Sequence, residues 1–146
     1  MVNRNYKKGA GFEYEWMYYL IYHYFDNVRS YASKGVADVR SVPPKEAKSS
    51  LVIYAQCKNT KKGDYINPKE RRQLHECQQN FQCLVVEPFK KDRECFVKIE
   101  PWKLDGEIMK PDEFLKRYYG ISADTWKEWR NNWFREGIKR QPIDDN

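Results

Sequence analysis

The sequence predicts an α/β fold in which a helix, three strands, a second helix and two further strands follow one another along the chain. Two observations predict it. Apolar residues recur at helical spacing in residues 10–24 and 67–81, and runs of β-forming residues lie between and after these helices. A chain of 146 residues is also long enough for one compact domain with a sizeable core.

The first predicted helix, residues 10–24, has a broad apolar face that includes Phe12 and Trp16. Glu13 falls near the centre of this face, and Glu15 points the other way. A carboxylate on an apolar face is costly to bury unless a metal or a lysine satisfies it. The alternative is that both acids simply favour the positive end of the helix, which explains Glu15 well and Glu13 poorly. We therefore expect Glu13 to belong to a functional site.

Three strands are predicted next, over residues 28–32, 35–40 and 51–58. Because side chains alternate along a strand, Gln56 and Lys58 project from the same face of the third strand. Asp38 is an acidic residue among the β-formers of the second strand. If these two strands pair as a hairpin, a carboxylate, an amide and an ammonium group meet at one point.

The second predicted helix, residues 67–81, has Asn67 as its N-cap and Pro68 in its first turn. His75 lies on this helix and could act as a general base, although a lone histidine on a helix is more typical of a surface or packing position. Two further strands are predicted over residues 82–88 and 94–100.

The remaining segment, residues 105–146, is predicted to be a helical extension. One helix runs from Pro111 to Gly120, and Ser122 caps a second helix that carries Trp126, Trp129 and Trp133. The pair resembles a helix-turn-helix with a basic second helix, but Lys116 lies where that motif has a small residue. We favour the interpretation that the tryptophans cover the core or a dimer interface. A protein-interaction module is a third possibility.

Positive charge is concentrated beside Lys58. The net charge is +6, and residues 58–72 alone contain six basic residues against two acidic ones. This clustering favours a polyanion partner such as DNA, and the alternative is a solvated basic face. The candidate phosphate contacts are Lys8, Lys61, Lys62, Arg71 and Arg72.

Cysteine spacing and hydropathy exclude several classes of protein. The four cysteines form no Cys-x-x-Cys pair, so a zinc site is not expected. There is no signal-peptide pattern, and the most apolar run, residues 17–25, is far shorter than the ~20 residues that span a bilayer. We expect a cytoplasmic protein with reduced cysteines.

The pattern of Asp38 followed by Gln56-Cys57-Lys58, with Glu13 in a helix after the Gly-containing run of residues 8–11, resembles the PD-(D/E)XK nuclease superfamily. It is most similar to the archaeal Holliday-junction resolvases and to the Mrr-type restriction endonucleases, which use the Gln-x-Lys variant. The resemblance covers about residues 7–100. It implies a restriction-endonuclease-like αβββαβ core with a mixed central sheet in residues 1–104, and a homodimer.

The resemblance also implies an activity, namely metal-dependent hydrolysis of DNA, most like that of a Holliday-junction resolvase on branched DNA. Its cofactor would be Mg²⁺ or Mn²⁺, held by Glu13, Asp38, Gln56 and the backbone carbonyl of Cys57. Lys58 would orient the attacking water and stabilise the transition state, and the products would carry a 5′-phosphate and a 3′-hydroxyl.

Two features qualify this picture. Ser33 and Lys34 occupy the position of a Ser-containing loop near the scissile phosphate in resolvases, but a Ser-Lys-Gly turn needs no function of its own. Gln56 replaces the acidic residue of the resolvases and removes a negative charge from the metal site, so Glu13 gains importance. The alternative function is therefore a non-catalytic DNA-binding protein that retains the nuclease fold.

Overall fold

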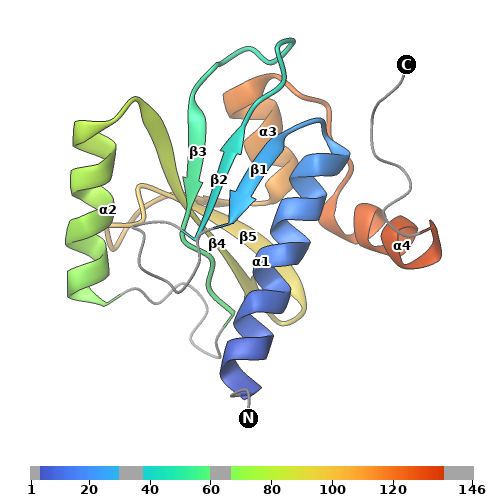
Figure 1. Cartoon of the computed structure of the whole chain (residues 1–146), viewed down its shortest axis with the longest axis horizontal. Helices are drawn as coiled ribbons and strands as arrows, with labels where there is room; N and C mark the ends of the chain where they lie inside the picture. Colours follow the sequence, from blue (N-terminus) through green and yellow to red (C-terminus); the bar gives the residue numbers. More distant parts are fainter. Residues whose placement is uncertain (1–3, 30–37, 60–66, 137–146) are drawn as a thin grey trace.

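The computed structural model describes residues 4–29, 38–59 and 67–136, and side chains within 11–28, 38–59 and 67–133. Within these ranges six strands form one sheet, in the order β1-β2-β3-β4-β5-β6, and four helices pack on it (Figure 1). The elements are α1 (Arg4–Tyr22), β1 (Asp26–Arg29), β2 (Val39–Val42), β3 (Val52–Ala55), α2 (Pro68–Asn80), β4 (Cys83–Lys91), β5 (Glu94–Ile99), β6 (Ile108–Met109), α3 (Pro111–Tyr119) and α4 (Trp126–Glu136). The predicted α/β class and element order are confirmed.

The sheet is mixed. β1, β2 and β3 are antiparallel to one another, as are β4, β5 and β6. β3 and β4 are parallel, and α2 lies between them in the chain, because parallel neighbours need a crossover connection. The predicted hairpin between the Asp38 strand and the Gln56 strand is present, with Val39 opposite Ala55.

Helices cover both faces of the sheet. On one face α1, α3 and α4 enclose the main core, in which Trp16, Ile53 and Val97 are completely buried. On the other face α2 packs through Leu74 and Cys77 onto Val85 of β4. Figure 1 shows α2 on one side of the sheet, with α1 and α4 on the other.

Several boundaries differ from those predicted. α1 begins earlier than expected, at Arg4, and β1 begins at Asp26. β3 ends at Ala55, and its pairing with β4 resumes as a single bridge between Lys58 and Phe89; between them, Pro88 has no N–H to donate to the ladder. β6, a strand of two residues, was not predicted.

The second C-terminal helix, α4, begins at Trp126, so the predicted cap at Ser122 is wrong. The cap is formed by Thr125 instead. Its hydroxyl accepts from the N–H of Glu128 at 3.1 Å, and the Glu128 carboxylate accepts from the N–H of Thr125 at 3.0 Å. The preceding helix, α3, ends as predicted at Gly120, which has the left-handed φ of 68° that favours glycine.

The tryptophans of α4 pack onto α1 within the same chain. Trp129 is 1% exposed, and its ring centroid lies 5.5 Å from that of Tyr19. The Tyr19 hydroxyl donates to the carbonyl of Asp124 at 2.7 Å, which fixes the approach to α4. These contacts favour core packing over the helix-turn-helix interpretation.

No helix in the described part of the chain is both long and apolar enough to cross a bilayer. The four cysteines are free thiols, and Cys77, Cys83 and Cys95 are buried as small packing residues.

Candidate active site

Asp38 and Gln56 lie side by side at one end of the sheet. Asp38 directly precedes β2 and Gln56 directly follows β3, and these strands are antiparallel neighbours. The N–H of Asp38 donates to the carbonyl of Ala55 at 2.8 Å, so the pairing extends to the candidate site. The hairpin therefore brings together two of the residues that the sequence analysis singled out.

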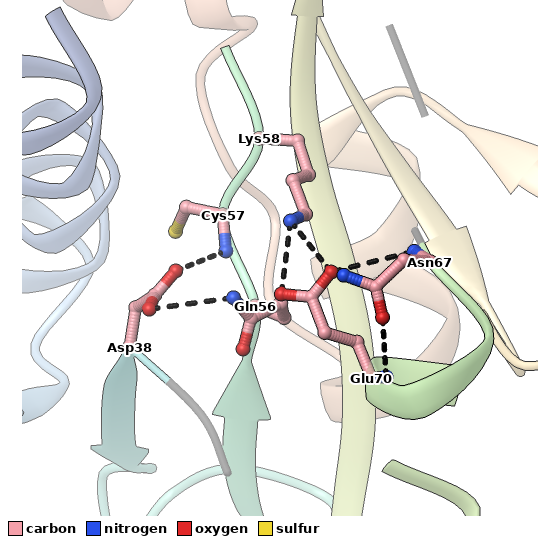
Figure 2. Close-up of polar contacts among 6 residues, drawn as sticks. All are labelled: Asp38, Gln56, Cys57, Lys58, Asn67 and Glu70. Atoms are coloured by element: carbon pink, nitrogen blue, oxygen red, sulfur yellow. Dashed lines mark hydrogen bonds and ion pairs between the residues drawn. The ribbon is translucent and has the colours of Figure 1, made fainter. Parts of the chain in front are cut away.

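The Asp38 carboxylate is held by the segment that follows β3. Its Oδ2 accepts from the backbone N–H of Cys57 at 2.9 Å, and its Oδ1 lies 3.4 Å from Nε2 of Gln56 (Figure 2). If the amide of Gln56 turned over, it would present an oxygen to the same place, beside the carboxylate. Two oxygen donors can thus face one point.

Asp38 has a perturbed acidity. Its pKa is raised to about 6, chiefly by burial and next by the negative charge of Glu13. The hydrogen bond from Cys57 and the positive charge of Lys58 act in the opposite direction, and the charge of Glu70 again favours the protonated form. The site therefore has an excess of negative charge that a bound cation would relieve.

Glu13 contributes to this field from α1. Its side chain is half-buried, next to the fully buried Phe12, and it is close enough for its charge to raise the pKa of Asp38 and of Cys57. Glu15 was expected on the opposite side of α1, near the positive end of the helix, and this is wrong: its side chain is only 15% exposed, and α1 begins at Arg4, about three turns earlier. Its carboxylate binds Lys90 of β4 at 3.0 Å and Arg130 of α4 at 3.5 Å. The two acids of α1 thus have different surroundings.

Lys58 lies beyond the end of β3 but is fixed by β4. Its N–H donates to the carbonyl of Pro88 at 2.9 Å, and its carbonyl accepts from the N–H of Lys90 at 3.0 Å. Its ammonium group does not contact Asp38 in this structure. It binds both carboxylate oxygens of Glu70, at 3.0 and 3.1 Å (Figure 2).

Glu70 is a site residue that the sequence analysis missed. It is the third residue of α2, where its N–H donates to the Asn67 side chain at 2.9 Å and its carboxylate accepts from the Asn67 N–H at 3.4 Å. This reciprocal capping box is visible in the sequence as Asn-Pro-Lys-Glu. The pattern predicts a helix start, but it gives no sign of the contact with Lys58.

The Cys57 thiol is not suited to act as a nucleophile. Burial and the negative charges of Asp38 and Glu13 raise its pKa well above the ordinary value, so the thiol stays protonated. The functional group of Cys57 at this site is its backbone.

The candidate DNA contacts are described only in part. Arg71 is half-buried and Arg72 is exposed, both on α2 next to Glu70. Lys8 lies in the first part of α1, but its side chain is outside the described set. Ser33, Lys34, Lys61 and Lys62 lie outside the described residues.

The donor set is compatible with Mg²⁺ or Mn²⁺. Among the described residues no three His, Cys, Asp or Glu side chains are placed to share a metal ion. The expected set instead combines the carboxylates of Glu13 and Asp38 with an amide oxygen of Gln56 and the carbonyl of Cys57. All four are oxygen donors, which these hard cations prefer.

Comparison with known proteins gives a match at the level of the fold. No protein-family model and no curated protein sequence matches the chain. Among solved structures, the chain is similar to Hjc, a Holliday junction resolvase from the archaeal hyperthermophile Archaeoglobus fulgidus, with a TM-score of 0.53 and 19% sequence identity. The match covers 64% of this chain and 73% of Hjc. The chain therefore has the restriction-endonuclease-like fold of this resolvase.

Proposed function

We propose that the chain is a metal-dependent DNA endonuclease that hydrolyses phosphodiester bonds in branched DNA as a homodimer. One observation carries the proposal. Asp38 and Gln56 meet at the end of a resolvase-like sheet, and Lys58 follows two residues later on a backbone fixed by β4. This arrangement combines oxygen donors for a cation with a positive group for a phosphate.

The metal would be held by Asp38, by the Gln56 amide oxygen and by the Cys57 carbonyl, with Glu13 as a further carboxylate. When bound, it would supply charge neutralisation at the phosphate and a water of lowered pKa. The N–H of Cys57 fixes the orientation of Asp38, so the carboxylate is already placed before a cation arrives.

Lys58 would act on the phosphate. An ammonium group beside a phosphodiester stabilises the negative charge that develops during attack, and it can also orient the attacking water. Its side chain is 18% exposed, so it is screened less than a surface lysine but remains accessible from solvent.

The preference for branched DNA and the dimeric state rest on the likeness to Hjc, whose described activity is Holliday-junction resolution. Two equivalent sites in a symmetric dimer would place paired cuts in a four-way junction. The basic residues of α2, Arg71 and Arg72, are next to Glu70 and would contact the phosphate backbone.

The test is cleavage of labelled four-way junction, flap, linear duplex and single-stranded DNA in Mg²⁺, Mn²⁺ or EDTA. Wild type is compared with Asp38→Ala and Lys58→Ala, and thermal melting shows that each variant is folded. Paired cuts in the junction that need metal, Asp38 and Lys58 are the expected result. Metal-dependent cuts found only in the other DNA substrates would support the endonuclease proposal but contradict the preference for four-way junctions.

A non-catalytic DNA-binding protein is the second candidate, and the neutral Gln56 favours it because one metal-binding charge is missing. This candidate predicts tight binding to DNA with no cutting in either metal. That result would overturn the endonuclease proposal.

A further inference from the structure

The contact between Lys58 and Glu70 joins the candidate active site to the start of α2. The ammonium nitrogen of Lys58 lies 3.0 and 3.1 Å from the two carboxylate oxygens of Glu70 (Figure 2). The side chains are 18% and 27% exposed, so the pair is partly shielded from solvent. Such a pair restrains a flexible lysine more than a surface ion pair does.

The Glu70 carboxylate is itself held in place. It accepts from the backbone N–H of Asn67, and its own N–H donates to the Asn67 side chain. The positive end of the α2 dipole also favours a negative charge at this position. Glu70 is therefore an anion with a fixed position, and not a mobile surface group.

The direction of these hydrogen bonds matters for the substrate. An ammonium group has three N–H donors. Two of them have acceptors in Glu70, which leaves the third for a phosphate oxygen or a water molecule. Because the Lys58 backbone is fixed by Pro88 and Lys90, the ion pair sets the direction of the remaining donor.

The charge balance points the same way. Gln56 supplies no charge at the position two residues before Lys58. Glu70 supplies one instead, and its charge also reaches Asp38. Within the described residues, Glu70 is thus the carboxylate that pairs with Lys58.

We propose that Glu70 is a positioning residue for Lys58, and that it provides the local negative charge that Gln56 does not. This inference rests on the proposed function for its kinetic consequence. The structural part of the inference is that the ion pair between Glu70 and Lys58 is present in the dissolved protein. It can be tested without measuring DNA cleavage.

The variant for the kinetic test is Glu70→Gln. Glutamine also completes a capping box, so α2 keeps its start, and thermal melting shows that the variant is folded. We expect kcat for DNA cleavage to fall about tenfold or more, because misplacing a catalytic group by about 1 Å can cost up to 10²-fold. KM should stay within about twofold, since the substrate contacts of α2 are retained. The matched control is Glu76→Gln, an exposed position on the same helix.

A second substitution separates charge from helix geometry. Gln56→Glu, added to Glu70→Gln, puts a carboxylate two residues before Lys58. Because Gln56 belongs to the proposed metal site, the double variant is compared with the single variant Gln56→Glu, and we expect Glu70→Gln to lower kcat much less in that background than in wild type. An equally large loss in both backgrounds would attribute it to the altered helix, and the positioning role would be abandoned.

The cleavage-independent test is the rate at which an amine-specific reagent labels Lys58, measured by mass spectrometry at fixed pH. We expect Glu70→Gln to raise that rate several-fold, and Glu76→Gln to leave it unchanged. Equal rates in wild type and Glu70→Gln overturn the inference, whatever the cleavage result. If Glu70→Gln raises the labelling rate of Lys58 but the wild-type protein cuts no DNA, the ion pair is supported and only the endonuclease proposal is contradicted.

Discussion

The backbone N–H of Cys57 donates to Oδ2 of Asp38 at 2.9 Å, although 19 residues separate the two in the chain. This hydrogen bond favours the charged carboxylate. Burial and the negative charge of Glu13 favour the protonated carboxyl group. Their effect outweighs that of the hydrogen bond, since the pKa of Asp38 is raised to about 6. Asp38 is therefore oriented by one neighbour, while its other surroundings disfavour its charge, which agrees with the metal-binding role proposed for it.

Asp38→Asn should stabilise the metal-free protein at neutral pH. The folded pKa of Asp38 is about 6 and the ordinary value is 3.8, so the folded state holds its proton more tightly. The stability of wild type should therefore fall as pH rises from about 4 to about 6. Asparagine carries no charge and can still accept from Cys57. We expect a gain of about 1–3 kcal/mol in the free energy of unfolding at pH 7.

Denaturant unfolding in EDTA at pH 7 and pH 4 measures this effect. The gain should vanish at pH 4, where wild-type Asp38 is protonated in the folded state. Asp105→Asn, at an exposed position, is the control and should change little at either pH. A gain of equal size at both pH values would show that the charge of Asp38 is not its cause.

The meeting of Asp38 with Gln56 could be predicted because it follows from local rules. Alternation along a strand assigns faces, and a hairpin places the end of one strand beside the start of the other. The contact between Lys58 and Glu70 follows from no such rule. It joins a strand end to a helix start, and no periodicity in the sequence relates those two positions.

The C-terminal segment shows a similar division. The end of α3 at Gly120 was predicted because a left-handed residue at a helix end favours glycine. The start of α4 was misplaced, although Thr125 and Glu128 have the spacing of a capping box, which is a stronger signal than Ser122 alone. β6 was missed because two residues are too few to show alternation.

His23 should make the protein sensitive to mild acid. Its Nε2 accepts from the N–H of Asp124 at 3.1 Å, so its Nδ1 carries the proton and donates to the carbonyl of Tyr19 at 2.8 Å. Burial lowers the pKa of His23 below its ordinary value of 6.5. The unfolded chain therefore takes up a proton before the folded one does, and stability should fall as pH drops below about 6.5.

The measurement compares the change in melting temperature between pH 7 and pH 5 in wild type, His23→Gln and His75→Gln. The melting temperature of His23→Gln should fall less between pH 7 and pH 5 than that of wild type, even if the variant is less stable at pH 7. His75 is exposed to solvent and stacks on the ring of Trp102, so His75→Gln serves as the matched histidine control. An unchanged loss in His23→Gln would assign the acid sensitivity to other groups.

Arg71 and Arg72 should contribute to DNA affinity and its dependence on salt. Each cation that neutralises a phosphate contributes about 0.9 to the slope of log K against log salt concentration on duplex DNA. We expect Arg71→Gln with Arg72→Gln to lower both the affinity and this slope, and to leave kcat at saturating DNA unchanged.

Titrations of fluorescent DNA at several salt concentrations provide the slope. Lys116→Gln is the control, because this lysine is exposed on α3, which covers the opposite face of the sheet from α2. A double-arginine variant with the wild-type slope would mean that DNA does not approach along α2. It would not bear on the chemistry proposed for Asp38.

Trp129→Ala should destabilise the whole protein, and not only its C-terminal helix. Trp129 is 1% exposed and contacts Tyr19 of α1 at 5.5 Å between ring centroids. Removing such a side chain from a core costs about 3–5 kcal/mol through lost transfer energy and the cavity left behind. Since α1 also carries Glu13, loosening this contact should weaken the placement of that carboxylate beside Asp38.

Denaturant unfolding followed by tryptophan fluorescence and by far-ultraviolet circular dichroism tests the claim, with Leu104→Ala as control because Leu104 is 81% exposed. If α4 is part of the core, both probes should report one transition, shifted to lower denaturant in Trp129→Ala and unshifted in Leu104→Ala. Two separate transitions, with only the first one shifted, would mean that the C-terminal helix unfolds independently. In that case α1 would hold Glu13 in place without support from α4.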